Sequence, residues 1–126
     1  MPGRTTVADV GSRGQHPRIR LDDNFSSPIR FSVLASLADG VELDFGTLAR
    51  VLQANDSALS KAIAHLQSTG YVATRKGQAG SRPRTWVRST ETGRQAFNGH
   101  LNALREIVEL GGRQSPWGMT RSDESG

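Results

Sequence analysis

A short helical pattern followed almost at once by a longer one constrains this chain more than any other feature. Apolar residues recur at helical spacing over residues 45–52, and Asp44 is placed to cap that helix. A turn of only four residues then leads to a longer helix, which Asn55 or Asp56 can cap and which ends near Ser68. The sequence therefore predicts two helices joined by a tight turn.

The longer helix is predicted to have one buried and one free face, because successive helical residues point about 100° apart. One side collects apolar residues: Leu59, Ala62, Ile63 and Leu66. The opposite side carries small or polar residues and no acid: Ser57, Lys61, Ala64, His65 and Ser68. Such an outer face suits a helix that enters a groove.

Helices are also predicted on both sides of this pair. Ser27 can cap the first of them, Pro28 suits its first position, and Asp39-Gly40 would end it. Thr90 can cap the last helix, which runs to about Leu110.

After the helix pair the pattern becomes extended. Residues 71–76 and 84–89 have the composition of strands, and Gly and Ser are frequent in the segment 77–83 between them. Residues 41–43 are also short and extended. The sequence thus predicts an α+β fold that is mainly α, with a two-stranded β-hairpin that has a flexible tip.

The positive charge of the chain is local. The 126 residues carry a formal net charge of +4, whereas residues 71–89 contain five cations and no acid: Arg75, Lys76, Arg82, Arg84 and Arg88. A positive surface this concentrated is typical of a protein that binds a polyanion, and phosphate contacts would offset the mutual repulsion of these side chains. A solvated basic hairpin is the alternative interpretation.

Several kinds of chemistry find no support in the sequence. There is no cysteine, which excludes disulfides, thiolate metal sites and cysteine nucleophiles. His16, His65 and His100 lie on separate elements, and no HExxH, GxSxG or P-loop motif is present. Adjacent acids occur only at Asp22-Asp23 and Asp123-Glu124, where solvation explains them better than a cation site. We expect no enzymatic activity, no cofactor and no metal.

The order of these elements resembles the MarR-like bacterial transcription regulators, which have a winged helix-turn-helix fold. The segments that carry the resemblance are SPIR (27–30), DFGTL (44–48), LSKAIAHL (59–66), GYV (70–72), RPRTWVR (82–88) and GR (93–94). Together they span roughly residues 25–110. No single segment is diagnostic, and the signal lies in their order.

The resemblance implies that the helix 55–68 lies in the major groove of double-stranded DNA and that the hairpin, or wing, flanks the duplex. Residues implied to contact DNA from this helix are Asn55, Ser57, Ser60, Lys61 and His65. Those implied to hold the phosphate backbone are Arg75, Lys76, Arg82, Arg84 and Arg88. The helix lacks the commonest bidentate base readers apart from Asn55 and Gln67, so specificity would rest partly on the wing and on DNA shape.

The last helix predicts a homodimer. Its apolar stripe extends beyond what one small core can cover, and its spacing suits packing against a partner helix. The predicted interface residues are Phe97, Leu101, Leu104, Ile107 and Val108. Packing of this stripe against residues 18–34 of the same chain is the alternative. A pocket for a small-molecule effector is common in the family that this chain resembles. An effector of unknown identity is therefore expected as a partner, although no convergent set of polar residues marks its site here.

Two other functions compete with DNA-binding regulation. A winged helix can serve as a protein-interaction module whose basic wing meets an acidic partner. Binding of structured RNA is a weaker alternative, because only Tyr71 and Trp86 offer aromatic surfaces in the strands.

The domain organisation is expected to be simple. We expect residues 1–24 and 113–126 to be mobile and residues 25–112 to form one domain. No signal-peptide core or apolar span is visible, which predicts a cytoplasmic protein that does not enter the membrane.

Overall fold

The structure, a computed structural model, describes residues 14–114. Of the two ends that we expect to be mobile, residues 1–13 and 115–126 lie outside the described residues. Backbone contacts divide the chain into two compact units. One is Asp22–Asn98, which contains the helix pair and the hairpin, and the other joins the described residues 14–21 to residues 99–114.

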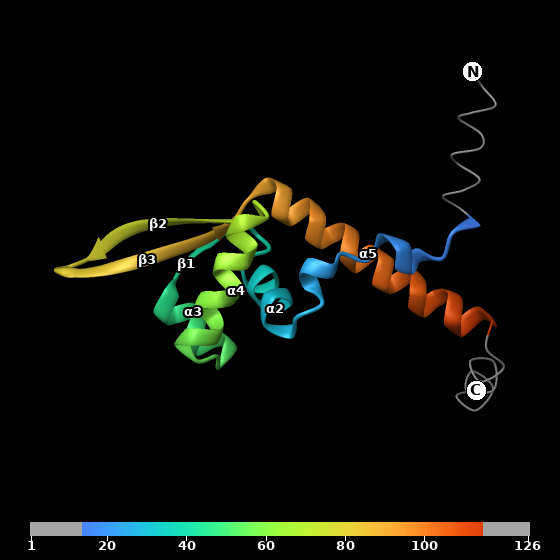
Figure 1. Cartoon of the computed structure of the whole chain (residues 1–126), viewed down its shortest axis with the longest axis horizontal. Helices are drawn as coiled ribbons and strands as arrows, with labels where there is room; N and C mark the ends of the chain where they lie inside the picture. Colours follow the sequence, from blue (N-terminus) through green and yellow to red (C-terminus); the bar gives the residue numbers. More distant parts are fainter. Residues whose placement is uncertain (1–13, 115–126) are drawn as a thin grey trace, which may run out of the picture. The chain divides into compact units, whose positions relative to one another are not determined.

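Three helices of the unit Asp22–Asn98 begin where the sequence predicts: α2 (Pro28–Ser36), α3 (Phe45–Leu52) and α4 (Asp56–Ser68) (Figure 1). Each is capped by a side-chain oxygen that accepts a hydrogen bond from a backbone N–H of the first turn. The pairs are Ser27 with Arg30 at 3.3 Å, Asp44 with Thr47 at 3.3 Å, and Asn55 with Ala58 at 2.7 Å. Because a cap acts only on the turn that follows it, these helix starts could be predicted from local sequence.

Helix α2 ends earlier than predicted. Its last residue is Ser36, and the N–H of Leu37 bonds to the carbonyls of Val33 and Leu34, which tightens the final turn. Gly40, at φ +81°, follows this turn shortly before β1. The apolar character of Leu37, which has no exposed surface, therefore reflects burial beyond the helix rather than its continuation.

Two short 3-10 helices, η1 (Pro17–Arg20) and η2 (Asp23–Phe25), precede α2 and were not predicted. Segments of this length complete about one turn and leave no periodicity to detect. Phe25 of η2 is only 4% exposed, and its ring stacks on Tyr71 with 5.5 Å between ring centroids. One buried ring thus anchors the residues just before α2 in the core.

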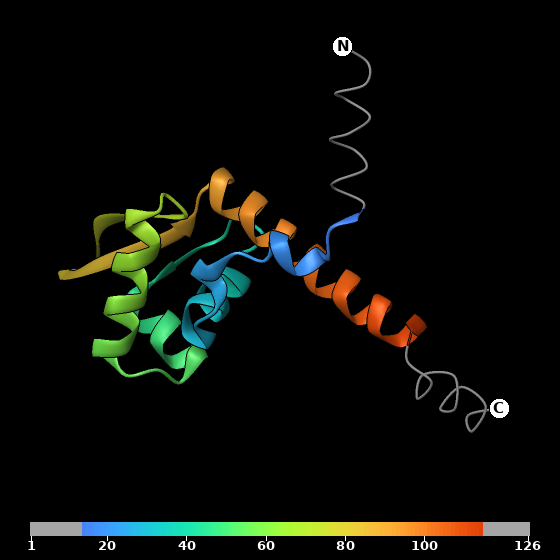
Figure 2. The same ribbon diagram turned by 45° about the vertical axis from the view of Figure 1, so that its right-hand side comes forward.

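Three strands form an antiparallel sheet in the order β1-β3-β2: β1 (Glu42–Asp44), β2 (Val72–Ala79) and β3 (Arg82–Ser89). The predicted extended segment 41–43 is thus confirmed as the region of a third strand. Strand β1 ends at Asp44, opposite Trp86 of β3. Beyond that point β2 and β3 continue as a hairpin that projects from the helices of this unit (Figures 1 and 2).

The turn of the hairpin is much shorter than the predicted segment 77–83, since only residues 80 and 81 separate the two strands. Gly77 lies in β2 because the Trp86 ring packs against it, and a Cβ atom at this position would be 2.8 Å from Trp86 Nε1. Pro83 is tolerated in β3 because β1 has already ended and the strand is an edge on that side.

The core of this unit lies between the three helices and the sheet. Side chains without exposed surface come from all of these elements: Val33, Leu34, Leu37, Leu48, Leu59, Leu66 and Val87. Helix α4 buries Leu59, Ala62, Ile63 and Leu66, which confirms the predicted inner face.

Helix α5 (Glu91–Gln114) begins after Thr90, whose Oγ1 accepts a hydrogen bond from the Gly93 N–H at 3.0 Å. The predicted cap is confirmed, and the helix continues past the predicted end near Leu110. Phe97 is 5% exposed, with its ring centroid 5.1 Å from that of Phe31. The dimer interface predicted from the sequence included Phe97, and its burial in the core of one chain removes it from that set.

The first turn of α5 lies close to the backbone just before β2, and Gly93 provides a test of this contact. A Cβ atom there would overlap the carbonyl group of Tyr71, which is backbone and cannot rotate away. We expect Gly93→Ala to lower the free energy of unfolding by about 1–3 kcal/mol, the usual effect of overpacking. Gly99→Ala is the matched control, because nothing lies within 4 Å of that position and alanine favours the helix by about 1 kcal/mol. Urea unfolding curves that rank Gly93→Ala at or above the wild type would contradict this packing.

Candidate nucleic-acid interface

The outer face of α4 is exposed along its whole length. Its residues are small or polar: Ser57, Ser60, Lys61, Ala64 and Ser68. At the start of the helix, the side chain of Asn55 is occupied in capping the N–H of Ala58. The carboxylate of Asp56 stands in the first turn and is the only acid on this helix. The surface that α4 presents to solvent is therefore free of acid beyond its first residue.

An open pocket of about 440 Å³ lies between α4 and the hairpin. Ser60, Ala64 and Gln67 line it from the helix, and Thr74, Lys76 and Thr85 line it from the strands. Gln67 Nε2 donates to Thr74 Oγ1 at 3.0 Å, and Lys76 Nζ donates to Thr85 Oγ1 at 3.3 Å. The pocket thus joins the outer face of α4 to the hairpin through neutral groups and one ammonium. The sequence analysis identified Ser60 and Lys76 but assigned no role to Thr74 or Thr85.

His65 has a partner within the chain. Its Nε2 lies 2.7 Å from Asn24 Oδ1, and the main-chain carbonyl of Asn24 accepts a hydrogen bond from Arg30 Nε at 2.8 Å. The His65 side chain therefore contacts η2. The sequence could not predict this contact, because the two residues are separated by 41 positions in the chain.

The five cations of the hairpin are divided between the two faces of the sheet. Register places Arg75 opposite Trp86, and Arg88 opposite both Ala73 and Glu42. Side chains alternate between faces along a strand. Arg75, Arg82, Arg84 and Arg88 therefore share one face of the sheet, and Lys76 lies on the other.

Two of these arginines have carboxylate partners on β1. Arg75 donates to both oxygens of Glu42 at 2.8 Å, and its guanidinium lies 5.3 Å from the centre of the Trp86 ring. Arg84 forms an ion pair with Asp44. The charge of the five hairpin cations is therefore partly balanced within the chain, since β1 brings two acids to the face of the sheet that carries Arg75 and Arg84.

These ion pairs perturb the acids. The hydrogen bonds from Arg75 lower the pKa of Glu42 below its usual value, and the charge of Arg88 adds to this effect. Hydrogen bonding to Thr47, followed by the contact with Arg84, lowers the pKa of Asp44. Both carboxylates thus stay ionised at a pH at which an isolated acid would become protonated.

A helix pair with a polar outer helix, flanked by a hairpin, matches a known family. The family model described as a winged helix DNA-binding domain matches residues 29–108. This chain belongs to that family. The winged helix expected from the resemblance to MarR-like regulators is thereby confirmed, and the hairpin β2–β3 is its wing.

Solved structures of proteins from several organisms share this fold. A transcriptional regulator homologue from Pyrococcus horikoshii OT3 is 26% identical, with a TM-score of 0.66 over 70% of this chain and 87% of that chain. YusO from Bacillus subtilis is 16% identical, with a TM-score of 0.66 over 97% and 86%. Bacillus subtilis PadR, solved in complex with operator DNA, is 18% identical, with a TM-score of 0.54 over 60% and 46%. No curated protein matches the sequence.

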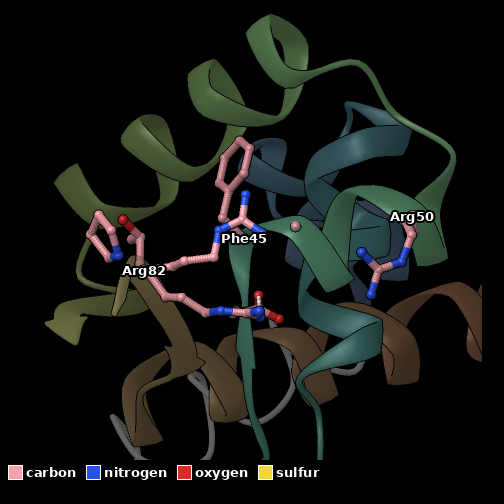
Figure 3. Close-up of a pocket in the computed structure, with 8 residues that line it drawn as sticks. Phe45, Arg50 and Arg82 are labelled. Carbon is pink, nitrogen blue, oxygen red and sulfur yellow. Dashed lines mark hydrogen bonds and ion pairs between the residues drawn. The ribbon is translucent and has the colours of Figure 1, made fainter. Parts of the chain in front are cut away.

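A second pocket, of about 410 Å³, opens at the corner between the wing and α3. Its lining includes Arg82 and Arg84 from β3, and Phe45, Gly46 and Arg50 from α3. Arg82 approaches this pocket from β3 and Arg50 from α3 (Figure 3). Arg50 Nη2 donates to Thr47 Oγ1 at 3.2 Å. Arg50 was not predicted from the sequence, because a single arginine on a short helix carries no signal by itself.

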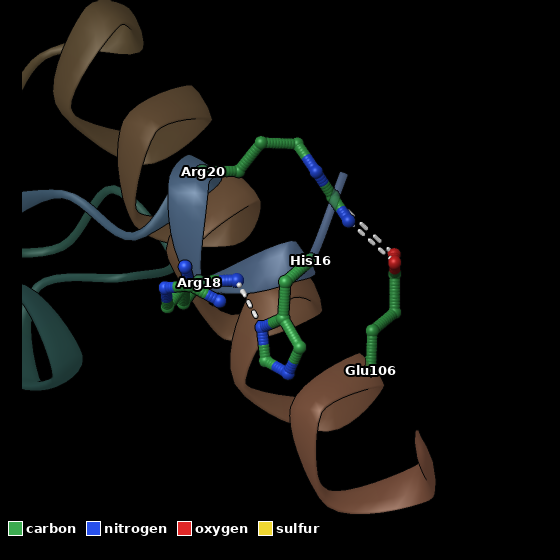
Figure 4. Close-up of polar contacts among 4 residues, drawn as sticks. All are labelled: His16, Arg18, Arg20 and Glu106. Carbon is green, nitrogen blue, oxygen red and sulfur yellow. Dashed lines mark hydrogen bonds and ion pairs between the residues drawn. The ribbon is translucent and has the colours of Figure 1, made fainter. Parts of the chain in front are cut away.

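The C-terminal half of α5 carries the remaining predicted interface residues. Leu104 is 37% exposed and Val108 is 72% exposed, and together they form an apolar surface beside Arg105 and Glu109. Leu101 and Ile107 are half-buried. In the same unit, Arg20 of η1 forms an ion pair with Glu106 of α5 (Figure 4). Residues before α2 thus contact part of α5 through this ion pair, whereas Leu104 and Val108 stay exposed.

Within residues 14–114, no three His, Cys, Asp or Glu side chains gather into a group that could hold a metal ion. None of the helices in this part of the chain has the length and apolarity needed to cross a membrane.

The paired acid Asp44 predicts how stability depends on pH. A carboxyl whose pKa is lowered by folding stabilises the native state above its usual pKa, and this contribution is lost as pH falls through the lowered value. Asp44→Asn keeps a capping side chain but loses the charge that holds Arg84. We expect this variant to be less stable at pH 7 and to lose less stability on acidification than the wild type.

Asp39→Asn is the control, since Asp39 is exposed and forms none of the ion pairs found among the described residues. The measurement is thermal unfolding between pH 7 and pH 3 followed by circular dichroism. Parallel pH profiles for Asp44→Asn and the wild type would mean that the ion pair with Arg84 adds no stability.

Proposed function

We propose that this protein is a homodimeric, sequence-specific regulator of transcription that binds double-stranded DNA with α4 in the major groove and the wing on the phosphate backbone. The observation that carries the proposal is the exposed outer face of α4, which has no acid after Asp56 and continues into the pocket that contains Lys76 of the wing. A groove lined by phosphates admits a helix whose outer side chains are small and uncharged or positive.

The outer face of α4 also indicates how bases would be read. Ser57, Ser60 and Lys61 are exposed on its first two turns, where side chains of a recognition helix reach base edges. Ala64 offers only a methyl group, which suits apolar contact with thymine. Because few side chains here form bidentate contacts, part of the specificity would come from DNA shape.

The wing would contact phosphates unequally. Lys76 lies on the sheet face that lines the pocket beside α4. Arg82 forms no ion pair with the described residues, so its charge is available to a partner. Arg75 and Arg84 are bound to Glu42 and Asp44, and a phosphate would have to share them. The fold shared with PadR, which was solved on operator DNA, supports the same use of this scaffold.

The exposed surface of Leu104 and Val108 supports the homodimer. These two residues are one helical turn apart and form a largely apolar surface near the end of α5. Burial of apolar surface contributes about 25 cal/mol per Å², and a second copy of the same helix offers a complementary stripe.

The DNA-binding function is tested by selecting bound sequences from random duplex DNA and then measuring variants on the selected site. We expect Lys61→Ala to weaken binding to that site by about 1–3 kcal/mol and to change binding to random DNA much less, because a base contact carries sequence information. Lys76→Ala should weaken binding to both DNAs alike and reduce the slope of log affinity against log salt by about 0.9, because a phosphate contact carries none.

Both variants should unfold like the wild type, since both side chains are exposed. Absence of salt-dependent binding by the wild-type protein to any duplex would overturn the proposed function and favour the protein-interaction alternative.

The dimer is tested by replacing both Leu104 and Val108 with Glu. We expect the wild type to have the mass of a dimer at micromolar concentration and the double variant to be monomeric, with much weaker operator binding, because two recognition helices are needed for two half-sites. Asn102→Glu is the control, because it adds an acid to an exposed position of the same helix outside the apolar stripe. Sedimentation equilibrium of a double variant that stays dimeric would exclude this interface.

A further inference from the structure

We propose that the pocket between the wing and α3 binds a backbone phosphate of the DNA, and that Arg50 is a phosphate contact that completes the interface. This inference rests on the proposed function. It adds a contact from the first helix of the helix-turn-helix, which the charge pattern of the sequence did not suggest.

The charge of the pocket is unbalanced. Three guanidinium groups, those of Arg50, Arg82 and Arg84, line it together with a single carboxylate, Asp44. Arg84 is paired with Asp44. Arg50 and Arg82 form no ion pair with the described residues, so two positive charges remain without a counter-charge in this part of the chain. Like charges in one pocket repel, and an anion between them removes that repulsion.

The donors of the pocket suit a phosphate. The guanidinium group presents several N–H donors in a planar fork that matches phosphate oxygens. Arg50 uses Nη2 to donate to Thr47, and its other nitrogens have no hydrogen-bond acceptor among the described residues. The arginines come from different elements, Arg50 from α3 and Arg82 and Arg84 from β3, so a group in the pocket is approached from two elements (Figure 3).

Continuity with the pocket beside α4 indicates that the phosphate belongs to DNA. Phe45 and Thr85 line both pockets. A duplex whose major groove holds α4 therefore passes its backbone over the same corner of the molecule. The first helix of a helix-turn-helix crosses the backbone in this way. Gly46 lies beside both charged groups, since a Cβ atom there would make ordinary van der Waals contacts, 3.7 Å from Asp44 Oδ2 and 3.9 Å from Arg50 Nη1.

The test compares Arg50→Gln, Arg50→Lys and the wild type on the selected site and on random duplex. Arg50→Gln removes the charge and keeps a long, helix-favouring side chain. We expect it to lose the same factor of affinity on both DNAs and to reduce the salt slope by about 0.9, one phosphate contact. Arg50→Lys should keep the wild-type slope, because it keeps the charge. Arg18→Gln, an exposed arginine outside this pocket, is the control and should behave like the wild type.

A titration of the wild type with inorganic phosphate, without DNA, separates backbone phosphate from a free phosphorylated ligand. Under this proposal, millimolar phosphate does not saturate the pocket, and the Arg50 side-chain resonance shifts only with duplex DNA. Saturable phosphate binding together with an unchanged salt slope for Arg50→Gln would assign the pocket to a free anion and overturn the proposal. If the wild type binds DNA and Arg50→Gln has the same salt slope as the wild type, this inference is wrong and the proposed function is unaffected. If the wild type binds no DNA, both the inference and the proposed function are wrong.

Discussion

One carboxylate connects the parts of this winged helix. Asp44 is the last residue of β1, the cap of α3 and the partner of Arg84 on β3. A single side chain therefore links the start of the helix-turn-helix to the wing, and the distance between the two depends on it. The pocket that contains Arg50 is lined by this same carboxylate.

The helices could be predicted from the sequence because their causes are local. Caps such as Ser27 and Asn55 act within a few residues, and the buried stripe of α4 repeats with the helical period. The ion pairs could not be predicted in the same way. Arg75 and Glu42 are separated by 33 positions, and only the register of β1 on β3 brings them together.

The same limit applies to the candidate site. The residues exposed on α4 could be predicted from the sequence. The contact of His65 with Asn24 and the position of Arg50 in a pocket beside the wing could not. Glu42 and Asp44 have two opposite effects on the binding of an anion to the wing. They lower the positive potential of the wing, and they hold Arg75 and Arg84 in fixed positions, which reduces the side-chain entropy lost when an anion binds. The hairpin thus carries two arginines that ion pairs restrain, Arg75 and Arg84, and other cations that form no ion pair with the described residues.

The separation between the two faces of α4 has an evolutionary consequence. Residues that hold the helix in the core, such as Leu59 and Leu66, are fully buried, whereas Ser57, Ser60 and Ala64 make no contribution to that core. Mutations at the exposed positions can therefore accumulate without loss of the fold. A gene duplicate of this protein can therefore change the outer surface of α4 in single steps. Replacement of Gln67, which donates to Thr74, is the change that would also alter a contact between α4 and the sheet.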